Sequence, residues 1–370
     1  MPTYEVLSYS DPEQRQKWRD ICQRFSGLDI SYYPEYAYLF ELNGDGKAHC
    51  YVYYESPIDI VLYPFLKRCI NEIEIFADIP LNINDIITPY GFGGYFRTSD
   101  LVDMEKFYKS FQVYCRQNQI VSEFIRFNPI LKNQSYSPKD VQIRRRNETV
   151  VMDLTQPLDD LWMGMTPSCR NKVRKSRNYG VDIVIDQDAS HLGTFYSIYC
   201  DTMERLGSPN YYYFLLTWFE NMLTLLKGHA VLCHALYRNS TIMSAIFLFS
   251  KDIINYFLSG SIYEMRNSAA NNLMLYEVAL WAQKRGIKYF HLGGGYLPND
   301  NLFKFKASFS PLHIPFYTGE AIHDQKLYRE LNRRRWGPLG PKVTNFFPAY
   351  RIPVKDQSER TDPGTFWGRL

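Results

Sequence analysis

The order of predicted strands and helices repeats in the two halves of the chain, and this repetition constrains the fold more than any other feature. Each half contains three strand-like runs, then a helix, then one more strand. In the first half we expect these elements at 48–55, 58–66, 72–77, from Ser99 or Asp100 to about Asn118, and at 121–127. In the second half we expect them at 229–237, 241–249, 252–260, 271–285 and 288–292. The pattern β-β-β-α-β predicts an internal duplication with little sequence identity between the copies.

The length of 370 residues favours two domains, because single cores rarely grow so large. Short connections between consecutive strands indicate antiparallel pairing. The fold class is therefore a mixed α/β (α+β) architecture: two similar domains with mixed, mostly antiparallel sheets. We place the domains at 1–150 and 151–335, and expect an irregular, proline-rich tail at 336–370. Further elements are predicted as a strand around 141–153, a strand at 313–318 and a helix at 323–336.

Cysteine usage and the lack of long apolar runs predict a soluble, cytoplasmic protein. The seven cysteines are odd in number, scattered, and contain no Cys-x-x-Cys pair, which is typical of reduced thiols. The N-terminus lacks the basic and apolar regions of a signal peptide. Apolar runs such as 245–249 are far shorter than the roughly 20 residues of a membrane span. The net charge of +3 is too small to indicate nucleic-acid binding by itself, and we expect no DNA partner.

The stretch 288–309 combines a buried strand, three glycines and two lysines. Gly293, Gly294 and Gly295 end the strand and permit close backbone approach. Alternation in Phe303-Lys304-Phe305-Lys306 predicts a second strand with both lysines on one face. Glycine lets backbone N–H groups face a ligand and lysine supplies a charge, so a substrate site is expected. The alternative is a tight loop beside an edge strand with solvated lysines.

A second glycine loop occupies the equivalent place in the first half. Tyr90 is followed by Gly91, Gly93 and Gly94, and the predicted helix begins shortly after them. A glycine loop at a helix N-terminus offers backbone donors to an anion or to a substrate carbonyl. The alternative is a tight turn between a strand and a helix.

A basic helix is predicted at the start of the second half. Thr166 or Ser168 caps it, Pro167 suits its first turn, and Gly180 suits its C-terminal cap. Five basic residues and no acid lie between 170 and 177: Arg170, Lys172, Arg174, Lys175 and Arg177. Their mutual repulsion indicates an anionic partner such as the phosphate of a nucleotide, a coenzyme or tRNA. The alternative is a solvated basic face.

Covalent and metal-assisted catalysis are not indicated by any motif. The sequence contains no Gly-x-Ser-x-Gly, His-Glu-x-x-His or Walker loop. Its seven histidines are dispersed, and we interpret His291, inside an apolar strand, as a satisfied core residue. No metal site is expected. Direct transfer between two bound substrates, in which positioning and electrostatics supply the rate, fits the remaining features.

Several stretches, taken in order, resemble the FemAB-like branch of the GNAT acyltransferase superfamily, which includes the BioF2-like acetyltransferase domain. The matching stretches cover most of residues 30–320. They are Pro89–Gly94, Arg170–Lys175 with Gly180-Val181, Tyr199–Leu206 with Tyr212–Phe214, Asn272–Glu277 with Gly286, and Leu292–Gly295 with Phe305-Lys306 and Phe309.

The resemblance implies tandem GNAT-like domains that move an acyl or aminoacyl group to an amine. Fem ligases use aminoacyl-tRNA and extend the peptide of a peptidoglycan precursor, whereas other relatives use acyl-CoA. No tightly bound cofactor is implied. In Fem enzymes a Phe-Lys pair after the last core strand lies at the reaction centre, so Phe305 and Lys306 are the catalytic candidates. Lys304 is the competing lysine.

The site is expected in the cleft between the two domains. Substrate-binding candidates come from both halves: Tyr90, Gly91, Gly93, Gly94, Arg170, Arg174, Lys175, Tyr212, Asn272, Tyr276, Gly293, Gly294, Gly295 and Lys304. The acceptor is expected to be a small-molecule or glycopeptide amine, such as a cell-wall or surface-glycan precursor, with tRNA as one candidate partner. The closely spaced glycines of an acyl-CoA loop are absent from 262–271, which argues against plain CoA binding there. A non-catalytic protein that binds glycan or RNA on the same fold is the alternative.

Overall fold

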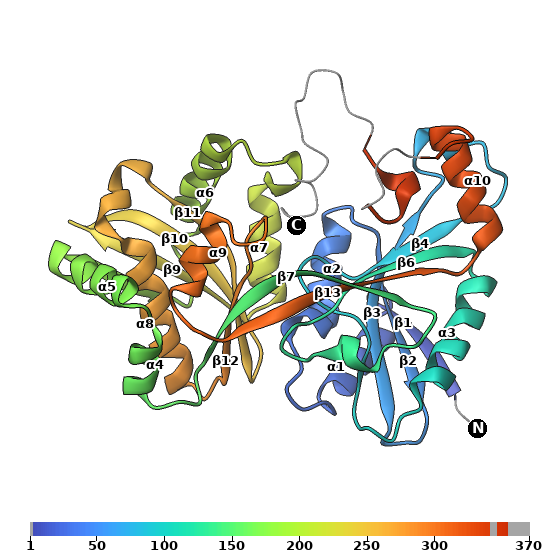
Figure 1. The fold of residues 1–370 in the computed structure, drawn as a ribbon, viewed down its shortest axis with the longest axis horizontal. Helices are drawn as coiled ribbons and strands as arrows, with labels where there is room; N and C mark the ends of the chain where they lie inside the picture. The colour runs from blue at the N-terminus through green and yellow to red at the C-terminus, as the bar shows by residue number, and fades with distance from the viewer. Residues whose placement is uncertain (1–2, 341–345, 354–370) are drawn as a thin grey trace.

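A single twisted sheet runs through both halves of the molecule. The computed structural model describes residues 3–340 and 346–353. Its strands form a 13-stranded sheet in the order β1-β2-β3-β4-β6-β13-β7-β12-β11-β10-β9-β8, with β5 paired to β3. Figure 1 shows two lobes that meet where β7 and β13 cross the middle of the molecule.

The first half contains most of one lobe. Its elements are β1 (Thr3–Ser8), α1 (Pro12–Cys22), η1 (Ile30–Tyr32), α2 (Pro34–Leu42), β2 (Lys47–Tyr54), β3 (Ile60–Cys69), η2 (Glu74–Phe76), β4 (Asn84–Ile87), β5 (Phe96–Arg97), α3 (Met104–Gln117), β6 (Ile120–Arg126), η3 (Asn133–Tyr136) and β7 (Gln142–Asp153), where η denotes a 3₁₀ turn.

The second half begins with two short helices and repeats the three-strand unit. Its elements are α4 (Leu158–Gly164), α5 (Pro167–Tyr179), β8 (Val181–Asp186), α6 (Leu192–Leu206), η4 (Asn210–Tyr212), α7 (Leu216–Leu225), β9 (Ala230–Tyr237), β10 (Ser240–Phe249), β11 (Ile253–Ser261), η5 (Tyr263–Ser268), α8 (Ala270–Lys284), β12 (Tyr289–Gly293), α9 (Asn301–Ala307), β13 (His313–Ile322), α10 (Gln325–Trp336) and η6 (Ala349–Arg351).

The predicted duplication is confirmed by the pairing of the strands. In the first copy, β2, β3 and β4 are antiparallel, α3 follows, and β6 returns parallel to β4. In the second copy, β9, β10 and β11 are antiparallel, α8 follows, and β12 returns parallel to β11. Every other paired strand in the described residues is antiparallel. The expected mixed, mostly antiparallel fold class is therefore correct.

Two predictions for the first half are wrong. Residues 72–77 are not a strand, because Phe76 is buried against the C-terminal region in the turn η2, and β4 supplies the third strand instead. The helix starts at Met104, where the Asp103 carboxylate accepts hydrogen bonds from Glu105 N and Lys106 N. Strand β5 lies between the glycine loop and this helix, so the loop does not lie at a helix N-terminus.

The predicted second strand after the three glycines is also wrong. Residues 301–307 form the helix α9, because the Asp300 side chain accepts a hydrogen bond from Phe303 N at 2.7 Å and caps its first turn. Residues two apart on a helix point to nearly opposite sides. The helix therefore separates Lys304, which is exposed, from Lys306, which faces the interior.

The C-terminal segment returns to the first lobe. Strand β13 is longer than predicted and pairs with both β6 and β7. Helix α10 and the turn η6 then pack on the first half, where Leu331 and Tyr350 join Phe76 in a small core (Figure 1). The boundaries proposed for the two domains stay a prediction. The predicted irregular tail falls largely on 341–345 and 354–370, which lie outside the described residues.

Packing between α2 and α7 holds the two lobes together. Trp218 of α7 is buried, and its indole Nε1 donates a hydrogen bond to Leu39 O of α2 at 3.1 Å. Its ring also lies 5.9 Å from the ring of Phe40. One apolar cluster thus spans both lobes and fixes their relative position. Among residues 3–340 and 346–353, no helix combines the length and apolarity needed to cross a bilayer.

Candidate active site

A cavity of about 600 Å³ lies between the two lobes. One wall comes from the first half, around Asp29 and Tyr90, and from residues 146–149 in the middle of β7. The opposite wall comes from α6 and β11 of the second half. Eight residues predicted from the sequence line it: Tyr90, Gly91, Tyr212, Gly293, Gly294, Gly295, Phe305 and Lys306. The structure therefore brings together the glycine segments of both halves and the Phe-Lys pair.

The cavity opens where two parallel strands separate. Strands β11 and β12 pair only between 253–255 and 289–291. Beyond this point β11 continues to Ser261 along β10, while β12 shifts register against β7 at His291 and Gly293. The far half of β11 thus loses its neighbour on one side and lines the cavity.

Lys306 is a half-buried cation on the wall of this cavity. Its Nζ donates a hydrogen bond to Gly294 O at 2.8 Å and lies 5.9 Å from the centre of the Tyr256 ring. Burial lowers the pKa of Lys306 to about 8, and the nearby carboxylate of Asp300 partly offsets this effect. The group is therefore mostly charged at neutral pH, yet it pairs with a carbonyl rather than with a carboxylate.

The glycines at 293–295 allow the loop to pack closely against Lys306 and helix α9. Gly293 has φ +75°, and a Cβ added there would lie 3.2 Å from Lys306 Nζ. A Cβ on Gly294 would lie 2.6 Å from Glu148 O of β7, which is too close for any side chain. A Cβ on Gly295 would clash at 2.2 Å with the Asp300 carboxylate that caps α9. The loop and the helix carrying Lys306 can pack this closely only without side chains at 294 and 295.

His291 presents an unpaired nitrogen in the same cavity, which the sequence analysis missed. Its Nδ1 lies 3.3 Å from Asn255 Oδ1, whereas its buried Nε2 has no hydrogen-bond partner among the described residues. Burial, together with the smaller effect of the charge of Lys306, lowers the pKa of His291 to about 3. The imidazole is therefore neutral, and donation from Nδ1–H to Asn255 leaves the Nε2 lone pair free.

A buried polar chain fixes His291 across the two lobes. Asn255 Nδ2 donates to Asp29 Oδ1 at 3.1 Å, and Asn128 Nδ2 donates to Asp29 Oδ2 at 2.8 Å. Burial raises the pKa of Asp29, although these hydrogen bonds counteract the rise. Asp29 and Asn128 belong to the first half, and Asn255 and His291 to the second, so the chain ties the orientation of the imidazole to the contact between lobes.

A second cavity, of about 440 Å³, adjoins the first and contains an uncompensated arginine. The two cavities share Tyr90, Pro209 and Tyr212. Arg126, which is only 7% exposed, lines the second cavity and lies over the ring of Phe124 at 5.5 Å. Its guanidinium makes no ion pair within residues 3–340 and 346–353, and burial lowers its pKa. A buried charge without a counter-ion is costly, which indicates a place for an anion.

The other two arginines of this second cavity share one counter-ion. Arg68 Nε lies 2.8 Å and Arg351 Nε 2.5 Å from the carboxylate of Asp85, which is fully buried. Asp45, also on the wall, accepts a hydrogen bond from Tyr211 Oη at 2.8 Å. Arg126 is therefore the arginine on this wall that makes no ion pair in the described residues, although Asp45 lies near enough to act on its charge.

Comparisons with known proteins find one family match in the second half of the chain. Residues 167–305 match the model of the acetyltransferase (GNAT) domain family, a range that contains β11, β12 and Lys304 but ends one residue before Lys306. Residues 167–305 therefore form a GNAT-type acetyltransferase domain. Among curated proteins, none matches the sequence of the chain significantly.

Solved structures show that this chain shares the fold of FemX over both halves. The crystal structure of FemX covers 85% of this chain and 98% of its own, with a TM-score of 0.62 and 15% identity. L-PGS from Bacillus licheniformis covers 86% of this chain and 94% of its own, with a TM-score of 0.53 and 13% identity. The C-terminal domain of a putative lysylphosphatidylglycerol synthetase from Agrobacterium fabrum covers 90% and 100%, with a TM-score of 0.51 and 13% identity.

The basic residues predicted to bind phosphate lie outside the cavity between the lobes. Arg170 Nη1 donates to Met165 O at 2.5 Å, and the Arg174 guanidinium lies 5.1 Å over the Trp162 ring. Lys175 is exposed, as is Lys304. These four side chains are therefore not in contact with the cavity that holds Lys306.

Four other predicted residues have structural contacts instead. Asn272 is buried between α8 and α5, where its Nδ2 donates to Cys169 Sγ at 3.4 Å. Tyr276 packs on Trp162, with ring centres 5.0 Å apart. Gly93 N donates to Arg126 O, and a Cβ on Gly94 would lie 2.9 Å from Asn133 Nδ2. The tight-turn interpretation thus describes Gly93 and Gly94, whereas Tyr90 and Gly91 face the cavity.

Proposed function

We propose that this chain transfers an aminoacyl or acyl group from an activated donor to an amine acceptor in the cavity between the lobes. The observation that carries this proposal is the Lys306 ammonium, half-buried in the gap between β11 and β12 and held by Gly294 O at 2.8 Å. A half-buried charge that makes no ion pair in the described part of the chain costs stability, which is typical of a group retained for catalysis.

The chemistry requires no covalent intermediate with the protein. The acceptor nitrogen attacks the donor carbonyl carbon, a C–N bond forms, and the carbonyl oxygen becomes an oxyanion that Lys306 stabilises. The oxyanion then collapses and breaks the bond to the leaving oxygen or sulfur, which takes up the proton that the amine loses. His291 Nε2, the free acceptor in the cavity, receives a hydrogen bond from the amine and orients its lone pair toward the carbonyl.

The donor that we propose is an aminoacyl-tRNA. Where a CoA site would have a glycine loop, this chain has the 3₁₀ turn η5 and enters α8 at Ala269, which has no side-chain cap. Arg205 lines the cavity, and both Arg205 and Arg266 lie over the ring of Tyr263, at 5.2 and 4.2 Å. Arg205 on the wall and Arg266 on the same tyrosine place two positive charges together, which suits a polyphosphate backbone. One protein that shares this fold is described as a putative lysylphosphatidylglycerol synthetase, and lysyl is an aminoacyl group.

The acceptor is an amine that also carries an anionic group. Arg126 offers a buried positive charge in the adjoining cavity, beyond the shared Tyr90 and Tyr212. A carboxylate or phosphate bound there would place the rest of the acceptor along the tyrosines toward Lys306. A glycopeptide precursor and an amino acid or amino sugar phosphate both have this chemistry.

A comparison of donors tests the proposal. The wild-type protein is incubated with either radiolabelled alanyl-tRNA or acetyl-CoA, and with an acceptor panel of lysine, glucosamine 6-phosphate and a nucleotide-linked muramyl peptide. We expect label in an amide product from alanyl-tRNA, and binding of tRNA that weakens steeply between 50 and 200 mM salt. Transfer only from acetyl-CoA would overturn the tRNA assignment and keep the acyl transfer. No product from either donor would contradict the proposed function.

A further inference from the structure

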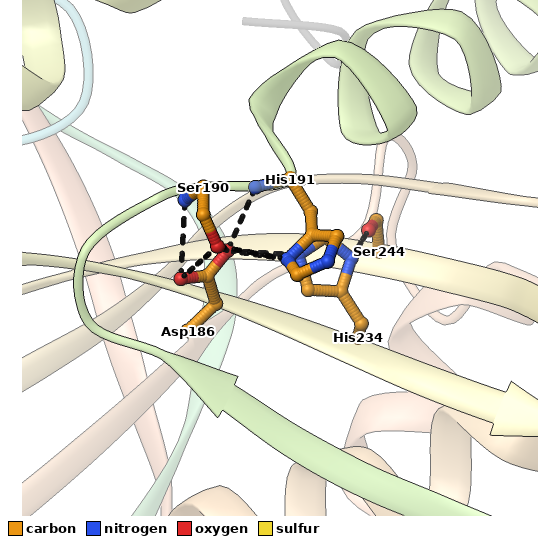
Figure 2. A network of polar contacts seen from close by, with 5 residues as sticks. All are labelled: Asp186, Ser190, His191, His234 and Ser244. Carbon is orange, nitrogen blue, oxygen red and sulfur yellow. Dashed lines mark hydrogen bonds and ion pairs between the residues drawn. The ribbon is translucent and has the colours of Figure 1, made fainter. Parts of the chain in front are cut away.

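A cluster of two histidines and one aspartate lies outside the active cavity, on the edge of the sheet in the second lobe. Figure 2 shows Asp186 at the end of β8, His191 at the start of α6 and His234 on β9, with their side chains turned toward one another. The ligating atoms of the three side chains all lie within 4.8 Å of each other. None of the three lines the two cavities described above.

The pairing of strands makes the cluster. His234 lies opposite Val184 in the antiparallel pair β8–β9, so its side chain is on the same face of the sheet as Asp186, two residues further along β8. The chain then turns, and Asp186 Oδ2 accepts a hydrogen bond from His191 N at 3.0 Å. That turn brings the imidazole of His191 over the carboxylate.

The nitrogen of His234 that faces the cluster has no hydrogen bond. His234 is only 2% exposed, and its buried Nε2 lacks a partner in the described part of the chain. Its other nitrogen, Nδ1, hydrogen-bonds with Ser244 Oγ, which is buried on β10 (Figure 2). A ring held by one nitrogen, with the other unpaired beside a carboxylate, is the arrangement of a metal ligand with its supporting hydrogen bond.

We propose that Asp186, His191 and His234 bind a divalent transition-metal ion, with Zn²⁺ as the expected metal. Tetrahedral zinc with bonds of 2.0–2.1 Å separates its ligand atoms by about 3.3 Å. Asp186 Oδ2 lies 3.2 Å from His191 Nδ1 and 3.6 Å from His234 Nε2, which matches two edges of such a tetrahedron. Two imidazoles and one carboxylate are ligands that zinc accepts, and the exposed side of His191 leaves the fourth position to water.

The ion has a structural role in the second lobe. It joins the edge strand β8 and its neighbour β9 to the first turn of α6, the helix that supplies Tyr199, Thr202 and Met203 to the wall of the active cavity. The three ligands do not line either cavity, so the ion would not contact the substrates. It would instead hold α6 in position.

Metal binding by the full chain tests this inference. Equilibrium dialysis against Zn²⁺, with metal quantified by mass spectrometry, should give one equivalent per chain, and Co²⁺ should give the visible absorption of a tetrahedral site. His191→Ala is the decisive variant, because this side chain is exposed and its loss should leave the fold intact. We expect its affinity for zinc to fall at least 100-fold, and that of His234→Gln to fall further. The matched control His49→Gln, in β2 of the other lobe, should bind zinc like the wild type.

The thermal midpoint gives a second readout. Zinc should raise the midpoint of the wild type and of His49→Gln, and should leave His191→Ala unchanged. The inference is overturned if the wild type binds less than one equivalent at 100 µM Zn²⁺, or if His191→Ala binds zinc as tightly as the wild type.

Discussion

Lys306 Nζ lies 2.8 Å from the carbonyl oxygen of Gly294, so a charged side chain of helix α9 closes onto the loop that follows strand β12. This contact depends on Gly294 and Gly295, neither of which has room for a Cβ. It places an ammonium group where β11 and β12 separate. We expect this charge to lower the stability of the folded protein and to raise the rate of acyl transfer.

The charge of Lys306 should lower the free energy of unfolding at neutral pH. Lys306→Met removes the ammonium, so at pH 7 the free energy of unfolding should rise by about 1–2 kcal/mol, after the loss of the hydrogen bond to Gly294 O. Between pH 8 and 10.5 the unfolded chain binds a proton that folded Lys306 has lost, so the wild type should gain stability as pH rises. The advantage of Lys306→Met should therefore shrink across that window in urea titrations. A variant less stable than the wild type at pH 7 would show that Lys306 is structural.

Transfer should lose rate above pH 8. The ammonium is present below the pKa of about 8 and is lost above it, so kcat should fall tenfold for each further pH unit. Lys306→Arg keeps its charge and should show a flat profile there, at a lower rate because its geometry differs. Initial rates from pH 6 to 10 measure this. Parallel profiles for the wild type and the arginine variant would argue against a charged Lys306 in catalysis.

Gly295→Ala should disable transfer by moving helix α9. The added Cβ would lie 2.2 Å from the Asp300 Oδ1 that caps this helix, so the cap or the loop must shift and Lys306 moves with it. We expect kcat to drop at least 100-fold and stability to fall by about 1–3 kcal/mol. Gly193→Ala in α6 is the control, because a Cβ there meets nothing within 4 Å and should be neutral or stabilising. Equal activities of the two variants would contradict this account of the glycine loop.

His291→Gln should lower kcat by about 10–100-fold with little change in KM, since it removes the lone pair that orients the amine. It should also change acid stability. Because folded His291 has a pKa of about 3, the unfolded chain binds a proton from pH 6.5 downward that the folded chain does not, and the wild type loses stability as pH falls toward 3. His291→Gln should lose stability less steeply in this range when unfolding is measured by circular dichroism. Unchanged kcat would assign His291 to the core alone.

Arg126→Met should raise the KM for the acceptor at least tenfold and leave the affinity for the donor unchanged. The reason is that the buried guanidinium of Arg126 makes no ion pair in the described residues and would bind the anionic group of the acceptor. Arg351→Met is the matched comparison, because Arg351 is already paired with Asp85 and should affect stability more than KM. If Arg126→Met leaves the acceptor KM unchanged, the acceptor's anion lies elsewhere.

Local signals in the sequence predicted the local structure well. Helix α5 begins with Thr166 as its cap and ends at Gly180 with φ +86°, as expected, because caps act on adjacent backbone groups. The β-β-β-α-β order was also readable, since each strand and helix has its own periodicity. The strand predicted for 303–306 failed because two-residue alternation is brief, and the Asp300 cap that starts α9 was overlooked.

Contacts between distant residues could not be predicted in the same way. Asp29 and Asn255 are 226 positions apart, and only the packing of the two lobes brings them together to hold His291. Nothing in the sequence around Arg126 distinguishes it from other residues of a strand, and only the fold shows that it is buried on the wall of the second cavity. The basic residues of α5 stood out in the sequence as a charged run, yet the fold turns them away from the active cavity.

The central claim, that Lys306 stabilises the transition state of acyl transfer, is tested most directly by comparing two lysines two positions apart. Rates of amide formation from alanyl-tRNA are measured at saturating donor and acceptor for the wild type, Lys306→Met and Lys304→Met. Lys304 is exposed on the opposite side of α9, so its variant should keep at least half of the wild-type kcat. Lys306→Met should lose about 10²–10³ in kcat while remaining folded. Full activity in a folded Lys306→Met protein, or equal losses in both variants, would contradict the account.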